Sequence, residues 1–269
     1  MASQLVTSQA PGLARRLRRL EMILRAPDGT LTPDWSERLL EEFAVLQLAV
    51  ESFRSIHTLD EAAQADLRTF IGWSRRSEEA LATRGVPDRW LVMGSILERD
   101  PPLTITRTWL AGLKTGRSAL LIDYGSDPEQ ALQPGVVLTG ELHFFPGAAP
   151  LRAVPGSVIR HGRRGEVAPD GVEAALRRFA LTLAGNPWLD LYPMFLASVV
   201  PARIGERWMV VDRQQAALPL AAESRPVATG WRLLAVGGAE PLDLFGEWDG
   251  RGFRPLTAFK GRSPIVIPT

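Results

Sequence analysis

The sequence predicts an α+β protein, with an N-terminal helical bundle packed on a larger, mainly antiparallel β region that carries one inserted helix. Up to residue 85 the apolar residues recur every three or four positions, as on one face of a helix. From residue 86 they mostly alternate with polar residues, as in strands whose successive side chains point to opposite sides. The spacing of apolar residues changes from helical to alternating at Arg84–Pro87. We therefore expect a helical domain over 1–85 and a β-rich domain over 86–269.

Three amphipathic helices account for the first domain. Their apolar stripes are formed by Leu13, Leu17, Leu20 and Leu24, by Leu39, Phe43, Leu46 and Val50, and by Ala63, Leu67, Phe70 and Ile71. Thr58 and Glu61 have the spacing of a capping box, whose side chains accept hydrogen bonds from the free amides at a helix N-terminus. Isolated helices of this length are marginal in water, so we expect each stripe to be buried in the bundle.

Short alternating segments predict the strands of the second domain. They lie at 90–97, 103–109, 119–122, 136–144, 207–212, 231–236, 242–248 and 253–259. Asp249-Gly250, between the last two, is typical of a tight hairpin turn. The inserted helix is predicted near 171–184 with Asp170 as its N-cap. For 188–200 the helical interpretation is preferred.

The composition limits the available chemistry and the compartment. The 269-residue chain has no cysteine, which excludes disulfides, thiolate metal sites and cysteine nucleophiles. Its formal net charge of +1 gives no overall field that would attract nucleic acid or an anionic membrane. No apolar run approaches the roughly 18 residues of a membrane span, and the N-terminus lacks the apolar core of a signal peptide. We therefore expect a cytoplasmic protein without a membrane partner, and the strong preference for arginine over lysine suggests a GC-rich bacterial genome.

Motifs of catalytic and metal sites are absent from the sequence. The three histidines, His57, His143 and His161, do not have metal-ligand spacing. There is no serine nucleophile elbow and no glycine loop that would bind phosphate. Lys114-Thr115-Gly116 indicates a turn, because no S-x-x-K motif accompanies it. We therefore expect no catalytic residue, metal site or cofactor.

Arg107 is the residue most easily mistaken for an active-site arginine. It shares a strand face with Ile105 and Trp109, so packing of that face on the core would bury its guanidinium. A buried charge without a partner is costly, and we therefore expect a paired, structural arginine. Asp123 and Glu141, on the strands that follow, are the nearest candidate partners, with Trp109 covering the guanidinium by a cation–π contact. In an alternative interpretation, the two carboxylates approach each other as an acid/base pair.

The first helix carries a dense basic cluster opposite its leucine stripe. The cluster consists of Arg15, Arg16, Arg18 and Arg19. Such a cluster could contact a phosphate backbone. The alternative is a solvated helix face that is partly paired with Glu21.

Several motifs resemble the mid-region of bacterial SWIM zinc-finger proteins. In the first domain these are SQAPGLA at 8–14, Trp35 with Leu39-Leu40, QADLR at 64–68 and Gly72-Trp73. In the second they are RTWL with Arg107 and Trp109, GRSAL with Arg117, FPGAAPLRA with Pro146, Gly147 and Arg152, and Trp248-Asp249-Gly250 with RPL at 254–256. The resemblance extends over nearly the whole chain, and we interpret these residues, with Asp123 and Glu141, as a structural motif.

The resemblance has one departure and implies little chemistry. The zinc finger that defines the family, C-x-C followed by C-x-H, normally lies N-terminal to this region, and this chain has no cysteine. Zinc binding and nucleic-acid contacts of the finger therefore do not transfer to it. The family's genes tend to lie beside those of MoxR-type AAA+ ATPases and von Willebrand A-domain proteins. The resemblance thus implies an accessory component of a chaperone-like or defence-associated assembly.

From these observations we expect a non-enzymatic scaffold or adaptor of a bacterial multi-protein system. Its expected partners are other proteins, among them a MoxR-type AAA+ ATPase and a von Willebrand A-domain protein. One alternative is a nucleic-acid-binding accessory module that uses the Arg15–Arg19 helix. A further alternative is an enzyme whose site has no recognisable motif.

Overall fold

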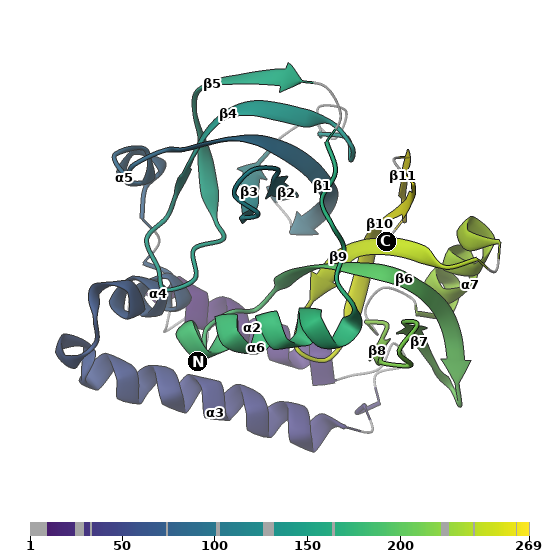
Figure 1. The fold of residues 1–269 in the computed structure, drawn as a ribbon. Helices are drawn as coiled ribbons and strands as arrows, with labels where there is room; N and C mark the ends of the chain where they lie inside the picture. Colours follow the sequence, from purple (N-terminus) through teal and green to yellow (C-terminus); the bar gives the residue numbers. More distant parts are fainter. Residues whose placement is uncertain are drawn as a thin grey trace. The chain divides into compact units, whose positions relative to one another are not determined.

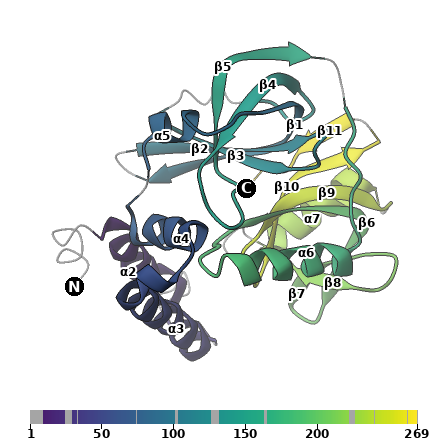
Figure 2. The same ribbon diagram turned by 60° about the vertical axis from the view of Figure 1, so that its left-hand side comes forward.

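A computed structural model describes residues 10–268, except 25–29, 33, 74, 101–102, 126–131, 163–164, 222–225, 239 and 262. Internal contacts divide the chain into two compact units. The helical unit comprises Met1–Glu79, Pro146–Ala149 and Gly185–Trp188; the β unit comprises Ala80–Phe145, Pro150–Ala184 and Leu189–Thr269. Helices followed by two large antiparallel sheets confirm the predicted α+β class (Figures 1 and 2).

The helical unit is built on three α-helices. They are α2 (Pro11–Leu24), α3 (Trp35–Arg54) and α4 (Glu61–Ile71), with a 3-10 turn, η1 (Ile56–Thr58), before α4. A short helix, α5 (Ser77–Leu81), leads into the β unit. The N-cap of α4 is Asp60, whose carboxylate accepts a hydrogen bond from Ala63 N at 2.7 Å. The predicted capping box was therefore wrong, because Thr58 lies in η1.

Residues far along the sequence complete the core of the helical unit. Leu67 and Ile71 of α4 are buried, and the ring of Trp188 lies 4.9 Å from that of Phe70. Helix α2 approaches the end of α4 closely, because a Cβ at Gly12 would lie 2.3 Å from the carbonyl oxygen of Phe70. The bundle thus depends on a segment more than a hundred residues beyond its last helix.

The first sheet of the β unit is a five-stranded Greek-key barrel. Its strands are β1 (Val86–Asp100), β2 (Leu103–Gly112), β3 (Ser118–Tyr124), β4 (Val137–Phe144) and β5 (Ala153–Gly162), in the order β3-β2-β1-β4-β5. Residues 86–91 of β1 pair with β4 and residues 90–100 pair with β2, and the β1–β2 pairing contains a bulge between Val92 and Gly94. The sheet curls so that its edges meet, where Leu120 N donates to Leu151 O at 2.7 Å in a parallel bridge. Strand order and directions are those of an OB-type barrel.

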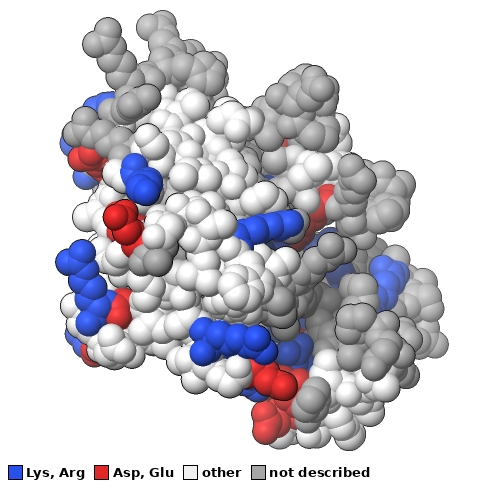
Figure 3. Space-filling view, turned by 90° about the vertical axis from the view of Figure 1, so that its right-hand side faces the viewer, with Lys and Arg blue, Asp and Glu red and all other residues white. Residues whose placement is uncertain are grey.

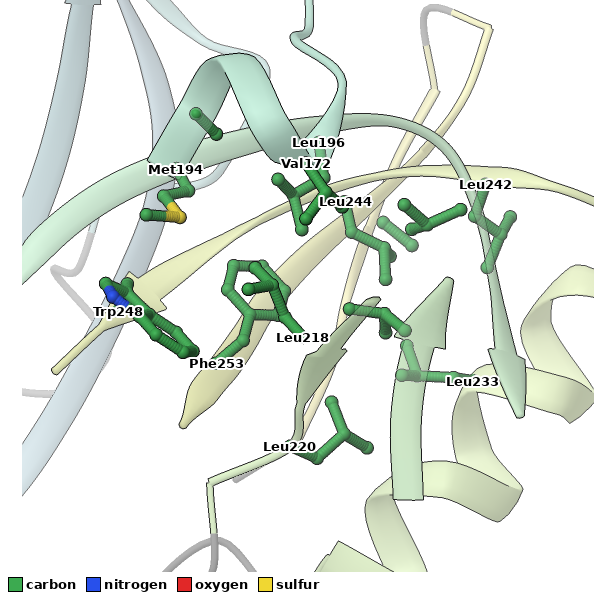
Figure 4. Packing of buried hydrophobic residues seen from close by; sticks show 14 of the residues in the cluster. Val172, Met194, Leu196, Leu218, Leu220, Leu233, Leu242, Leu244, Trp248 and Phe253 are labelled. Atoms are coloured by element: carbon green, nitrogen blue, oxygen red, sulfur yellow. The ribbon is translucent and has the colours of Figure 1, made fainter. Parts of the chain in front are cut away.

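The second sheet has six strands and two helices packed on it. Its strands are β6 (Tyr192–Ile204), β7 (Arg207–Val211), β8 (Ala217–Pro219), β9 (Leu242–Trp248), β10 (Phe253–Lys260) and β11 (Ser263–Val266), in the order β11-β10-β9-β6-β7-β8. The helices are α6 (Val172–Gly185) and α7 (Pro226–Gly237). Val172 of α6 and Leu233 of α7 point into one apolar core with Leu244 and Phe253 of the sheet (Figure 4).

Three sequence assignments in this region were wrong. Residues 192–204 form strand β6, whose buried and partly exposed residues alternate, rather than a helix. Residues 231–236 lie in helix α7, so the β region contains two helices instead of one. Pro226 occupies the first position of α7, where proline is favourable, and leucine and alanine are strong helix formers. Asp170 is not the N-cap of α6, as shown below.

Candidate functional site

A buried charge cluster joins the barrel to the second sheet through Arg107. Its Nη2 lies 2.8 Å from Glu247 Oε2, and its Nη1 lies 2.7 Å from Glu98 Oε2. Trp109 Nε1 donates to Glu247 Oε1 at 2.8 Å. Arg254 Nη1 lies 3.6 Å from Glu98 Oε1 and 3.9 Å from Glu247 Oε2. The cluster is electrically neutral, with two arginines and two glutamates from four strands.

The side chains at the centre of the cluster are largely buried, which favours a structural role for them. The side chain of Arg107 is 12% exposed and that of Glu247 is 1% exposed. The predicted partners of Arg107 were wrong: Asp123 lies on β3 opposite Thr106 and is exposed, and Glu141 is exposed on β4. Trp109 contributes a hydrogen bond to the shared carboxylate. These residues link strands of the two sheets, and Glu98 is the most exposed member of the cluster, at 38%.

Asp88 organises the turn between β2 and β3. Its carboxylate accepts hydrogen bonds from the Thr115 hydroxyl at 2.7 Å and from the amides of Thr115, Lys114 and Arg89. Burial acts to raise the pKa of Asp88, but these hydrogen bonds outweigh it and hold the pKa below its ordinary value. The Lys114-Thr115-Gly116 motif is thus a turn folded over an aspartate.

A shallow hollow of about 400 Å³ lies beside this turn. Its lining includes Arg89, Leu113, Lys114, Thr139 and Glu141. Asp88 is fully engaged with the turn, so Glu141 is the carboxylate of this lining that remains exposed. Asp123 does not belong to the lining, so this hollow does not bring together Asp123 and Glu141 as an acid/base pair.

His143 holds the chain segment that leads into strand β1. Its Nδ1 lies 2.8 Å from the carbonyl oxygen of Thr83, so Nδ1 carries the proton and donates. Gly85 and Gly156 accommodate the ring, because a Cβ at either position would lie 3.1 or 3.2 Å from Nε2. Among the described residues no group of three or more His, Cys, Asp or Glu side chains could hold a metal ion.

The loop of the FPGAAPLRA motif is held by Asp66 of α4, within the helical unit. Asp66 Oδ2 accepts a hydrogen bond from Ala148 N at 2.8 Å, and a Cβ at Gly147 would lie 2.2 Å from Oδ1. Pro146 and Gly147 therefore shape a tight contact with the helix. Burial raises the pKa of Asp66, the Ala148 hydrogen bond lowers it, and the charge of Asp60 raises it further, with a raised pKa as the result.

The remaining motif residues also have structural contacts. The Arg117 guanidinium lies 4.0 Å from the centre of the Phe144 ring, and that of Arg152 lies 4.5 Å from the Phe145 ring. Trp248 is buried in the core of the second sheet (Figure 4). Asp249 Oδ1 accepts hydrogen bonds from two amides of the β9–β10 turn.

Asp212 caps helix α6 from a distant turn. Its Oδ2 accepts a hydrogen bond from Val172 N at 2.9 Å, and its Oδ1 accepts from Gln214 N and Ala216 N. Asp170 instead pairs with Arg178 at 2.8 Å. A hollow of about 410 Å³ lies at this end of α6, but Asp212 already satisfies the amide of Val172.

Asp66 and Asp88 predict opposite responses of stability to pH. The pKa of Asp88 is lowered in the folded chain, so its stabilisation is present above the ordinary value of 3.8 and is lost as the pH falls through the folded pKa. The pKa of Asp66 is raised, so its contribution is present below 3.8 and is lost as the pH rises through the folded pKa. We expect Asp88→Asn to lower the urea midpoint at pH 7, and Asp66→Asn to leave it unchanged or raise it. Both differences should shrink on acidification; two variants that respond alike would contradict the assignment.

The basic cluster of α2 is divided between two environments. Arg15 and Arg18 are exposed, and the side chain of Arg19 lies outside the described part of the chain. Arg16 forms an ion pair with Glu42 of α3, and its guanidinium lies 5.2 Å from the Phe70 ring. On the face shown in Figure 3, the described Lys and Arg side chains are scattered, and several adjoin acidic ones.

Helix α3 leaves an apolar face exposed on the helical unit. Ala49 is the buried residue of this 20-residue helix. At 3.6 residues per turn, one side of about 140° contains the residues that we call the α3 face. They are Trp35, Ser36, Leu39, Leu40, Phe43, Leu46, Gln47, Val50, Phe53 and Arg54.

The exposure of the α3 face is large for apolar side chains. Leu40 is 71% exposed, Phe43 52% and Val50 43%, and Arg54 is the single charged residue of the face. At its C-terminal end Phe53 packs edge-on against Trp73 at 5.5 Å. Of the stripe that the sequence predicts to be buried, Phe43 and Val50 are exposed, and Leu39 and Leu46 are half-buried.

Comparison with known proteins identifies the helical region. Residues 1–71 match the family model of the SWIM-associated four-helix bundle domain. The predicted resemblance is therefore confirmed for this part of the chain, which is a SWIM-associated region. The motifs beyond residue 71, including FPGAAPLRA, lie outside that match, and Ser8 and Gln9 of the first motif lie outside the described residues. No curated protein and no solved structure matches the chain.

The fold and the match together define the class. It is an α+β protein with a SWIM-associated helical region, a five-stranded barrel and a six-stranded sheet. None of the described helices has the length and apolar character needed to cross a membrane.

Proposed function

We propose that this protein is a non-enzymatic scaffold that associates with other proteins through the α3 face. The observation that carries the proposal is the exposure of five large apolar side chains on that face: Trp35, Leu40, Phe43, Val50 and Phe53. Burying a fully exposed side chain of this size is worth about 1.5–3 kcal/mol. These five are 40–71% exposed, so a partner that covers them gains the corresponding part of that free energy. The proposed partners are a MoxR-type AAA+ ATPase and a von Willebrand A-domain protein, and the proposed compartment is the bacterial cytoplasm.

The use of polar residues elsewhere supports a scaffold over an enzyme. The buried carboxylates of Asp88, Asp212 and Glu247 are engaged with backbone amides or arginines. Catalytic groups, by contrast, need partners that a substrate can displace or complete.

The nucleic-acid alternative has less support. OB-type barrels bind oligonucleotides on the face of their second and third strands. Here Trp109 of β2 lies in an apolar cluster with Phe245 and Leu256 of the second sheet. The second sheet therefore covers this face at Trp109. On α2, Arg16 is paired with Glu42, which leaves Arg15 and Arg18 as the exposed arginines of the described cluster.

Capture from the native host tests the scaffold function. The full chain, Phe43→Glu and Leu48→Glu serve as baits, with bound proteins identified by mass spectrometry. Leu48 is a matched control, since it is 45% exposed on α3 but lies outside the α3 face. We expect an ATPase or a von Willebrand A-domain protein with wild type and Leu48→Glu, and at least a tenfold loss with Phe43→Glu. Equal recovery with all three baits would refute a role for the α3 face.

A further inference from the structure

Two basic residues lie side by side at the hollow beside Asp88. Asp88 Oδ1 accepts a hydrogen bond from the amide of Arg89 at 2.6 Å and another from the amide of Lys114 at 3.0 Å. Leu113 N donates to Arg89 O at 2.8 Å, which ties the turn after β2 to the first residues of β1. Because one carboxylate oxygen holds both backbones, Arg89 and Lys114 are fixed next to each other. Both residues line the hollow and are exposed.

The other walls of the hollow add one carboxylate and an apolar surface. Thr139 of β4 pairs directly with Arg89, and Glu141 follows two positions along the same strand face. Glu141 is exposed. Leu113 forms an apolar wall and lies against Gly165, where a Cβ would be 2.1 Å from Leu113 Cδ1. The volume of about 400 Å³ is within the range of small-molecule sites.

We infer that this hollow binds a small molecule that carries a phosphate monoester at one end and an amino group at the other. Two adjacent positive charges match the nearly double negative charge of a phosphate monoester better than the single charge of a carboxylate. Arginine and lysine both bind phosphate oxygens, and arginine does so through two parallel N–H groups. The amino group then donates to the carboxylate of Glu141, and the carbon chain between the two ends lies on Leu113.

The turn that carries Lys114 is already ordered around Asp88. Thr115 donates to Asp88 Oδ2 through its amide at 2.9 Å and through its hydroxyl at 2.7 Å. A Cβ at Gly112 would lie 2.5 Å from the same oxygen, so the close approach of the turn requires glycine there. A ligand therefore has to order two long side chains but no backbone, which lowers the entropic cost of binding.

This inference goes beyond the proposed function. The hollow belongs to the β unit and the α3 face to the helical unit, so the two surfaces are separate. Phe43→Glu should bind the ligand of the hollow as wild type does. The inference and the proposed function can thus fail independently of each other.

Titration calorimetry of the full chain with O-phosphoethanolamine tests the site. We expect ethyl phosphate, which lacks the amino group, to bind about tenfold more weakly. Lys114→Ala should weaken the binding of both compounds about tenfold, whereas Lys260→Ala, at the other lysine of the chain, should bind as wild type. Glu141→Gln should remove the preference for O-phosphoethanolamine over ethyl phosphate. The three substituted residues are exposed, so the melting temperatures should not change.

Three results would each overturn the inference. They are no binding of O-phosphoethanolamine up to about 10 mM, equal effects of Lys114→Ala and Lys260→Ala, and a preference over ethyl phosphate that survives Glu141→Gln. A phospholipid headgroup offers the same groups but has a singly charged phosphodiester. We therefore expect no binding to vesicles of phosphatidylethanolamine, and binding to vesicles without binding of the soluble compound would also contradict the site.

Discussion

Glu247→Ala is expected to lower the free energy of unfolding by about 3–5 kcal/mol, because removing one member of a buried ion pair leaves the others uncompensated. Glu247 is 1% exposed and accepts hydrogen bonds from Arg107 and Trp109. Without it the guanidinium of Arg107 keeps Glu98 as its one carboxylate partner among the described residues. Arg107→Leu should also lower the melting temperature, since it leaves the carboxylate of Glu247 buried with a poorer set of partners.

Thermal and urea unfolding measure the loss of stability in Glu247→Ala, and Glu173→Ala serves as the control. Glu173 forms an ion pair with Arg177, but its side chain is 81% exposed, so we expect a change below about 0.5 kcal/mol. Similar melting temperatures for the two variants would show that the cluster does not hold the sheets together.

Asp212→Ala is expected to destabilise the β unit by about 2–4 kcal/mol. The substitution removes the acceptor of the buried Val172 amide, whose loss costs about 1–3 kcal/mol, and of the partly buried amides of Gln214 and Ala216, whose loss adds less because water can reach them. Asp170→Ala, at the position that the sequence suggests as the cap, should cost about 0.5 kcal/mol because it loses only a surface ion pair with Arg178.

Urea unfolding of both variants distinguishes the two assignments. If Asp170→Ala were the more damaging change, the helix would be capped from its own sequence and the contact from Asp212 would be unimportant.

Local patterns in the sequence predicted most of the elements but few of the contacts between them. The α+β class and the strands from 86 to 144 follow from the spacing of apolar residues along the chain. This spacing depends on neighbouring residues alone. Helix α7 was predicted as a strand, because Trp231-Arg-Leu-Leu-Ala-Val is apolar enough for either structure. Packing of Leu233 on the second sheet decides the outcome, and single-sequence patterns do not contain that information.

Long-range partners explain why the site could not be predicted in detail. Burial and pairing of Arg107 follow from its strand face, but its partner Glu247 lies 140 residues away. The cap of α6 comes from Asp212, 40 residues away, where local spacing suggested Asp170. The apolar stripe of α3 was visible in the sequence, yet nothing local distinguishes a stripe that is buried in its own bundle from one that is left partly exposed.

The most direct test of association through the α3 face is hydrogen–deuterium exchange of the full chain, alone and in the assembly purified from its host. We predict slower exchange in the assembly for amides of residues 36–54, because a covered helix opens less often. The segments that line the hollow beside Asp88, at 87–89, 113–114 and 139–141, should be unchanged. Protection of those segments, with α3 exchanging as in the isolated chain, would contradict a scaffold that works through α3 and would place the function at the hollow.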